Sequence, residues 1–169
     1  MRGWASFDET GMYRYTLHRR WGGADARRIC FCLLNPSTAD ARVLDPTLTR
    51  CVRYAQAWGF GAMEVVNIFA LRSTDPRGLR EASDPVGPGN DRAIRRAAGR
   101  CEMLVAGWGN AHNVHRSLGA RAGSVRSLLQ GIVEIRCLGV TGAGEPKHPL
   151  YLRADLRPQR LAQIEQSGA

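Results

Sequence analysis

Long hydrophobic runs are missing from this chain of 169 residues. A membrane-spanning helix needs roughly 20 consecutive apolar residues, and no stretch of the sequence approaches that length. The amino terminus also lacks the apolar core of a secretory signal. We therefore expect a cytoplasmic protein that has no membrane partner.

Paired cysteine motifs are missing as well. The five cysteines include no C-x-x-C pair, which argues against a zinc or iron–sulfur site. They stand in apolar contexts, where a reduced thiol behaves as a small hydrophobe, as is usual for proteins of the cytosol. His112 and His115 lie three residues apart, but the sequence offers no third ligand beside them. We expect neither a metal nor another cofactor.

Lysine is nearly absent, since Lys147 is the only lysine among 24 basic residues, and the formal net charge is +9. Arginine binds phosphate through two parallel hydrogen bonds and stacks on bases, so this charge favours a nucleic-acid or nucleotide partner. A GC-rich genome that places arginine on an ordinary surface explains the same composition. The charge alone leaves these two interpretations equally open.

The length, together with the absence of internal repeats and low-complexity segments, indicates one domain over residues 1–169. Four apolar runs predict buried strands, and their starts are spaced by roughly 30–40 residues, as in repeated βα units. The alternating segment 3–17, with turn residues at 8–11, predicts an amino-terminal β-hairpin. We expect an α/β fold with three α/β/α layers, a mostly parallel four-stranded central sheet and this added hairpin. The predicted strands lie at about 28–34, 63–69, 101–108 and 132–138, and the predicted helices at about 45–58, 76–82, 89–99, 113–130 and 157–166.

Asparagine follows or interrupts two of the predicted strands. The first strand ends at Asn35-Pro36, and Asn67 stands within the second apolar run. Open α/β sheets bind ligands at the carboxyl ends of their strands, so both amides are candidates for ligand contacts. Asn35 is suited to positioning a water or a ligand hydroxyl, and an Asx turn before proline is the structural alternative. Asn67 has the donors and the acceptor to read the amide edge of a base, or to make a cross-strand contact.

A histidine-proline pair, His148-Pro149, follows the last predicted strand. The histidine is able to donate a hydrogen bond to a developing oxyanion, or merely to satisfy backbone groups of the loop. Other chemistries have weaker signals. Ser37 lacks the G-x-S-x-G elbow of a serine hydrolase, and Gly142-x-Gly144 lacks the Gly-Lys-Ser/Thr ending of a phosphate loop.

Six short motifs span nearly the whole chain: LLNPSTADA (33–41), DPT (45–47), VVNIFALRSTDP (65–76), DPVGPGND (84–91), AGWG (106–109) and GEPKHPLYL (144–152). Together these motifs resemble a bacterial domain-of-unknown-function family, number 1643. Membership of that family implies no activity by itself.

The order of the motifs is also similar to the uracil-DNA glycosylase superfamily, whose parallel sheet carries its site at the strand ends. That resemblance implies that Asn35 places the hydrolytic water, that Asn67 reads the base and that His148 stabilises the leaving base anion. The chain departs from the superfamily because it lacks the glycine ahead of the first motif and the serine after His-Pro. An uncharged Asn35 can orient water without taking its proton, which suits an oxocarbenium-like centre that needs little nucleophilic push.

The same resemblance extends to DNA. Trp108-Gly109 matches the end of the third strand, and Leu150 or Tyr151 takes the place of a residue that wedges into the duplex. We therefore expect an enzyme that hydrolyses the N-glycosidic bond of a nucleobase, in DNA repair or on a modified base or free nucleotide. The alternative is a non-catalytic module on the same fold that binds nucleic acid, with DNA favoured, or a nucleotide. The predicted substrate contacts are Pro36, Ser37, Asp40, Asn67, Phe69, Arg72, Trp108, Pro149 and Leu150, and the predicted phosphate contacts are Arg50 and Arg153.

Overall fold

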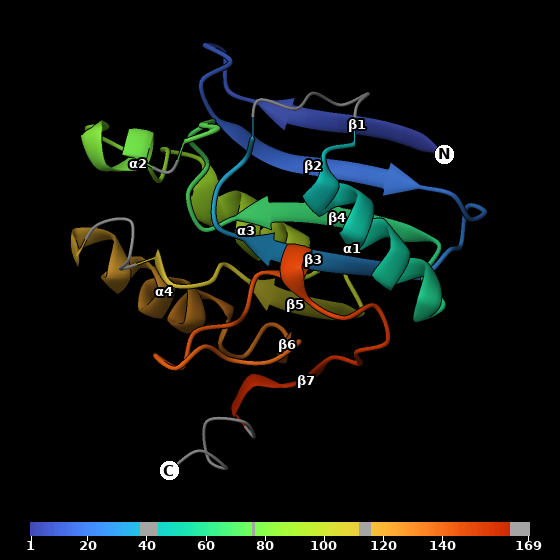
Figure 1. Ribbon diagram of the computed structural model, residues 1–169. Helices are drawn as coiled ribbons and strands as arrows, with labels where there is room; N and C mark the ends of the chain where they lie inside the picture. Colours follow the sequence, from blue (N-terminus) through green and yellow to red (C-terminus); the bar gives the residue numbers. More distant parts are fainter. Residues whose placement is uncertain (38–43, 76, 112–115, 163–169) are drawn as a thin grey trace.

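The strands of the chain form one seven-stranded sheet in the order β1-β2-β4-β3-β5-β6-β7 (Figure 1). The computed structural model describes residues 1–37, 44–75, 77–111 and 116–162, and of residues 116–118 it describes the backbone. The strands are β1 (Arg2–Phe7), β2 (Arg14–Arg20), β3 (Arg28–Leu33), β4 (Ala62–Asn67), β5 (Met103–Gly107), β6 (Ile135–Cys137) and β7 (Gln159–Arg160).

The sheet is mixed, and the prediction of a mostly parallel four-stranded central sheet is wrong. The pairs β3–β4, β3–β5 and β5–β6 are parallel, whereas β1–β2, β2–β4 and β6–β7 are antiparallel. The outer strands join the sheet because the edges of β4 and β6 present backbone groups that need hydrogen-bond partners. β2 pairs with the edge of β4, and Leu17 of β2 is fully buried.

The predicted tail helix at 157–166 is also wrong at its start. Gln159 and Arg160 form β7 and pair with Cys137 and Arg136 of β6. Pairing with the β6 edge overrides the helical pattern of this segment. The end of the predicted helix, 163–166, lies outside the described residues.

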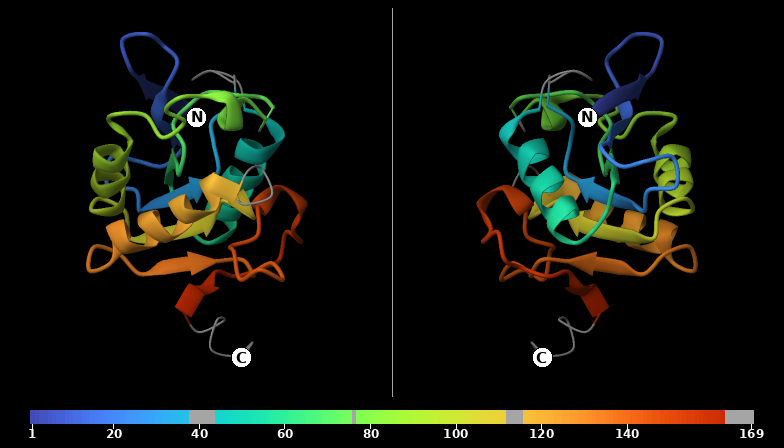
Figure 2. Two further views of the ribbon diagram at one scale, coloured as in Figure 1. Left: turned by 90° about the vertical axis from the view of Figure 1, so that its left-hand side faces the viewer. Right: turned by 90° about the vertical axis from the view of Figure 1, so that its right-hand side faces the viewer.

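Helices cover both faces of the sheet (Figure 2). Successive side chains of β3 point to opposite faces of the sheet, so they pack in two different cores. Phe31 packs against α1, and Cys30 and Cys32 lie in the core with α3 and α4. The helices are α1 (Pro46–Ala57), α2 (Arg77–Glu81), α3 (Asn90–Ala98) and α4 (Arg116–Leu129), and a 3₁₀ turn, η2, spans Pro149–Tyr151.

Helix α1 begins as the sequence predicts. The Asp45 side chain caps it, because Oδ1 accepts a hydrogen bond from Leu48 N at 2.7 Å, and Pro46 occupies the first turn. The helix ends before Gly59, whose φ of +80° suits glycine. Within the described part of the chain, no helix combines the length and the apolar character needed to cross a bilayer.

Candidate functional site

The candidate site lies where the parallel strands end, on the left-hand side of Figure 1. Asn67 of β4 pairs in register with Leu33 of β3, and Leu33 with Gly107 of β5. A Cβ added to Gly107 would lie 3.2 Å from Leu33 Cδ2 and 2.8 Å from Pro149 Cδ. Pro149 therefore covers the face on which Leu33 packs against α1. Asn67 and Gly107 are two strand spacings apart, about 10 Å.

Asn35 lies just beyond the end of β3 and is held by two hydrogen bonds. Its Nδ2 donates to the carbonyl oxygens of Ser73 at 2.8 Å and Pro36 at 3.2 Å. Carbonyl oxygens only accept, so these contacts fix which end of the amide is the nitrogen. Oδ1 accepts no hydrogen bond from any side chain or backbone group among the described residues. Asn35 thus offers a fixed acceptor at the edge of the sheet.

Asn67 presents a buried amide, with 2% of the residue exposed. Within the described part of the chain its side chain has no hydrogen-bond partner, although its backbone oxygen accepts from Asn90 Nδ2 at 3.0 Å. Asn90 Nδ2 also donates to Ile68 O at 3.1 Å, so this side chain clamps the end of β4. The fully buried side-chain atoms that lack a partner in the described part of the chain include Asn90 Oδ1 but no atom of Asn67, so the Asn67 amide keeps a small accessible surface.

His148 caps η2 and is held in one tautomer. Its Nδ1 accepts a hydrogen bond from Leu150 N at 3.4 Å. A backbone N–H only donates, so the neutral ring carries its proton on Nε2. Burial lowers the pKa of His148, and the charge of Asp45 opposes that shift only partly. The histidine is therefore a neutral donor at neutral pH.

Two charged residues at this edge were not predicted as part of the site. Asp45, which caps α1, also accepts a hydrogen bond from Ser37 Oγ at 2.7 Å, and its charge reaches His148. Arg14 of β2 is 3% exposed. Burial lowers the pKa of Arg14 to about 10, although Asp45 acts in the opposite direction. Arg14, Asp45 and His148 come from distant segments, and no local motif joins them.

Trp108 positions the loop that carries His148. Trp108 is 1% exposed in the core beside α3 and α4, and its Nε1 donates to the Glu145 carboxylate at 2.7 Å. Next to it, Gly109 N donates to Pro146 O at 2.8 Å. These bonds fasten the segment before His148 to the end of β5. The structure thus turns Trp108 away from the face that carries Asn67.

The remaining predicted residues are spread around this edge. Phe69 is 1% exposed and packs in the core beside α3 and α4. Arg72 Nη1 donates to Gly11 O at 3.0 Å, and its guanidinium lies 5.1 Å from the centre of the Phe7 ring. Arg72 therefore ties the β1–β2 hairpin to the segment after β4. Asp40, His112 and His115 lie outside the described residues.

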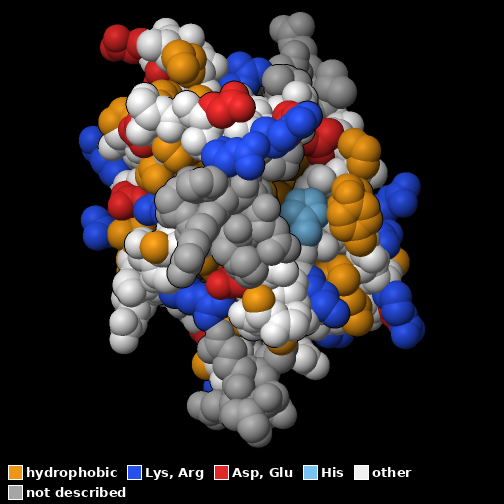
Figure 3. Space-filling view, turned by 60° about the vertical axis from the view of Figure 1, so that its left-hand side comes forward, with side chains coloured by type: hydrophobic (Ala, Val, Ile, Leu, Met, Phe, Trp, Pro, Cys, Tyr) orange, Lys and Arg blue, Asp and Glu red, His pale blue; other side chains and the backbone are white. Residues whose placement is uncertain are grey.

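A shallow pocket of about 470 Å³ adjoins the candidate site beside α1. Arg50 donates to Leu152 O and lies 5.6 Å over the Tyr54 ring. Arg153 is mostly exposed and pairs with Asp155 at 2.6 Å. Figure 3 shows this side of the molecule, where a histidine lies beside large hydrophobic side chains and basic side chains lie nearby. The pocket is lined by Leu44, Pro46, Thr49, Arg50, Arg53 and Leu150.

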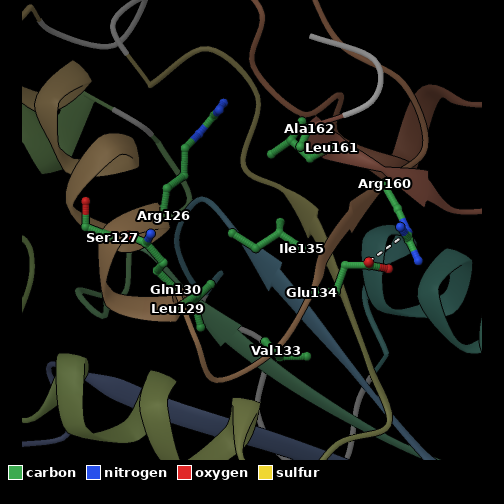
Figure 4. Close-up of a pocket in the computed structure, with 10 residues that line it drawn as sticks. All are labelled: Arg126, Ser127, Leu129, Gln130, Val133, Glu134, Ile135, Arg160, Leu161 and Ala162. Atoms are coloured by element: carbon green, nitrogen blue, oxygen red, sulfur yellow. Dashed lines mark ion pairs between the residues drawn. The ribbon is translucent and has the colours of Figure 1, made fainter. Parts of the chain in front are cut away.

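Another pocket, of about 460 Å³, lies between α4, β6 and β7 (Figure 4). Its charged side chains include Glu134 and Arg160, which pair with each other at 2.7 Å. None of the predicted site residues lines it. Among the residues that the structure describes, no group of three or more His, Cys, Asp or Glu side chains is placed to hold a metal ion.

We predict that Gly107→Ala lowers the free energy of unfolding by about 1–3 kcal/mol, because the new methyl group overpacks the site. The added Cβ would lie 2.8 Å from Pro149 Cδ and 3.4 Å from Lys147 O. The control is Gly123→Ala in α4, where nothing lies within 4 Å of the added Cβ. That variant should gain about 0.5–1 kcal/mol from helix propensity. Urea unfolding of both variants tests the contact, and equal stabilities would contradict it.

The fold and this edge define an α/β protein with a candidate ligand site at the carboxyl ends of its parallel strands. Residues 14–150 match the family described as Protein of unknown function (DUF1643), and the chain belongs to that family, as its motifs predicted. No curated protein and no solved structure matches the chain. The similarity to uracil-DNA glycosylases is therefore not confirmed by the comparisons and rests on the order of the motifs.

Proposed function

We propose that this protein hydrolyses the N-glycosidic bond of a nucleobase. The observation that carries the proposal is the fixed hydrogen-bonding state of two side chains at one edge of the sheet. Asn35 has both amide protons on backbone carbonyls, which leaves an acceptor. His148 has Nδ1 occupied by Leu150 N, which leaves a neutral donor. N-glycoside hydrolysis needs one group of each kind.

In the reaction, the bond between the sugar carbon and the base nitrogen breaks, and its electron pair moves onto the base. His148 Nε2–H donates to a base oxygen as negative charge develops there. Asn35 Oδ1 accepts a hydrogen bond from water and directs the water oxygen at the oxocarbenium-like carbon. Asn35 does not take the water proton, which passes to the departing base or to solvent. Both Asp45 oxygens already accept hydrogen bonds, from Ser37 and Leu48.

Asn67 would read the base. Its buried amide offers two donors and one acceptor, the complement of an amide or imide edge. In the sheet, Asn67 lies opposite Leu33 on the neighbouring strand, and Leu33 lies opposite Gly107 on the next strand. Pro149 packs beside Gly107. A site built to hydrogen-bond a base rejects analogues that leave its buried polar groups unpaired.

DNA fits the surroundings of this site. A base within a duplex must be flipped out before it can enter a pocket. Tyr151 is 85% exposed beside His148, and Leu150 lines the adjoining pocket with Arg50 and Arg53. An apolar side chain that wedges into a base step, flanked by arginines for phosphates, is a common means of kinking DNA.

The test is release of free base from oligonucleotides that each carry one uracil or modified base, with the matching nucleotides assayed alongside. We expect Asn35→Ala to reduce release by about 10- to 100-fold, because the water loses its orienting acceptor. Ser73→Ala is the matched control, since Asn35 bonds only the backbone oxygen of that residue. Circular dichroism and thermal unfolding establish that both variants fold.

Two results would contradict the proposal. Full release by Asn35→Ala would remove the role assigned to that residue. Wild-type protein that binds oligonucleotides in a salt-dependent manner but releases no base would favour a non-catalytic binding module. Such a module would keep its affinity after loss of Asn35 or His148 and would lose it with the arginines.

A further inference from the structure

A groove of about 430 Å³ lies between α3 and the β1–β2 hairpin. Helix α3 covers the face of the sheet opposite α1, so this groove is distinct from the candidate site (Figure 2). One wall carries three arginines, and the other carries hydroxyl and aromatic side chains. The groove is lined by Ser6, Tyr15, Thr16, His18, Gly89, Arg92, Ala93, Arg96 and Arg100.

The three arginines form a row. Arg92, Arg96 and Arg100 are four residues apart, which places them on one side of the helix and its final turn, about 6 Å from each other along the axis. Like charges at this spacing destabilise a helix. Neither Arg92 nor Arg96 forms an ion pair with a residue that the structure describes. Their charges are therefore available to an anion in the groove.

Arg100 also lines the groove, but it pairs with the buried carboxylate of Glu64. Its Nε donates to Glu64 Oε2 at 2.8 Å, and Glu64 is fully buried. His18 Nε2 lies 3.6 Å from Glu64 Oε1. Burial lowers the pKa of His18, although Glu64 opposes that shift. Glu64 thus offsets one of the three guanidinium charges, and Arg92 and Arg96 supply the excess.

An aromatic platform adjoins the arginine row. Trp4 of β1 stacks on His18 with ring centroids 4.5 Å apart and an angle of 7° between the planes. Trp4 is opposite His18 in the hairpin, and Ser6 is opposite Thr16, so these four residues share one face. Trp4 is 47% exposed, so part of its ring surface can receive another flat group.

We infer that this groove binds single-stranded nucleic acid, with consecutive phosphates along Arg92 and Arg96 and a base stacked on Trp4. Proteins that hold single strands combine a cationic track for the backbone with aromatic side chains for the bases. A row of cations contacts a polyanion repeatedly, whereas one free phosphate is held by cations that converge on it. The inference does not depend on base release, since it concerns binding on the other face of the sheet.

Fluorescence anisotropy with a labelled single-stranded oligodeoxynucleotide, measured over a range of salt concentrations, tests the inference. We expect R92Q/R96Q to weaken binding on the order of tenfold and to reduce the slope of log K against log salt by about 1.4, or 0.7 for each lost contact. Trp4→Ala should weaken binding about fivefold with little change of slope, because stacking carries no charge.

Arg95→Gln is the matched control for Arg96→Gln. Arg95 is exposed on the same helix and loses the same charge, but it does not line the groove. We expect R95Q to weaken binding less than about twofold and R96Q to weaken it clearly more. The R92Q/R96Q variant should lose affinity for the strand whether or not the protein releases base, because both arginines lie in this groove and outside the proposed catalytic site.

Three results would overturn the inference. Wild-type affinity in a folded R92Q/R96Q variant would show that the row makes no contact. Equal losses in R95Q and R96Q would reduce the effect to general attraction by a basic protein. A deoxynucleoside monophosphate and an unlabelled strand can each be tested as competitors of the labelled strand at equal phosphate concentration. If the monophosphate competed as well as the strand, the ligand would be a free nucleotide.

Discussion

Replacement of His148 by alanine should lower the rate of base release by about 10²–10³-fold, as loss of one preorganised oxyanion donor does in other enzymes. The structure explains why this donor is preorganised. The Leu150 backbone N–H holds Nδ1, and Pro149 packs against the end of β5 at Gly107. The ring therefore has its Nε2 proton in place before substrate binds. Release of base at saturating substrate measures the loss.

Two companion variants separate chemistry from folding. His148→Gln keeps an N–H donor near the position of Nε2, so it should retain more release than His148→Ala. Lys147→Ala removes an exposed neighbouring side chain and should release base at the wild-type rate. If His148→Ala released base as fast as Lys147→Ala, the histidine would have only its structural task of capping η2.

The same histidine gives the pH dependence of stability a defined sign. Its ordinary pKa is about 6.5, and burial lowers it in the folded protein. The unfolded chain therefore takes up the proton first as pH falls below about 6.5, so stability falls in that range. Above that pH both states are neutral, and the group has no effect. Urea unfolding should show that the free energy of unfolding falls less below pH 6.5 in His148→Ala than in the wild type, because the variant lacks the titrating imidazole.

Much of the fold follows from patterns along the chain. The apolar runs at β3, β4 and β5 predicted strands because both faces of these strands are buried. The amino-terminal hairpin was also predicted and forms β1 and β2, whereas the edge strand β7 was not predicted, because its pairing depends on a neighbour that the local sequence does not encode. β7 has only two residues, Gln159 and Arg160, and both are exposed. β6 is shorter than predicted because Ile132 is 42% exposed and bonds back to Leu129 O at the end of α4.

Sequence reasoning predicted which residues lie near this edge of the sheet better than it predicted where their side chains point. Asn35, Asn67 and His148 were identified because each follows or ends an apolar strand. Trp108 was predicted as a substrate contact only from the resemblance to uracil-DNA glycosylases, yet it comes one residue after Gly107, and strand alternation turns it to the opposite face. Asp45 and Arg14 were missed because they approach the site only through tertiary contacts. Asn67, Leu33 and Gly107 are aligned on neighbouring strands and share one face of the sheet. Because successive residues of a strand point to opposite faces, this alignment separates Trp108 from the candidate site.

Replacement of Arg100 by leucine should lower the free energy of unfolding by about 2–4 kcal/mol, because it leaves the carboxylate of Glu64 buried without its main partner. Glu64 is fully buried, and Arg100 donates to it through two nitrogens. The side chain of Arg100 is 42% exposed, so we expect less than the full cost of breaking a completely buried pair. Urea unfolding at neutral pH measures the loss.

The exposed pair between Arg27 and Glu102 is the matched control. Its atoms lie 2.8 Å apart, and both side chains are at least half exposed, at 56% and 50%. Arg27→Leu should therefore cost less than about 1 kcal/mol. The double variant R100L/E64L should recover much of the stability lost in Arg100→Leu, because it removes the buried charge together with its partner. Equal losses of unfolding free energy in Arg100→Leu and Arg27→Leu would contradict this account. Arg100 would then be available to bind phosphate, as Arg92 and Arg96 are.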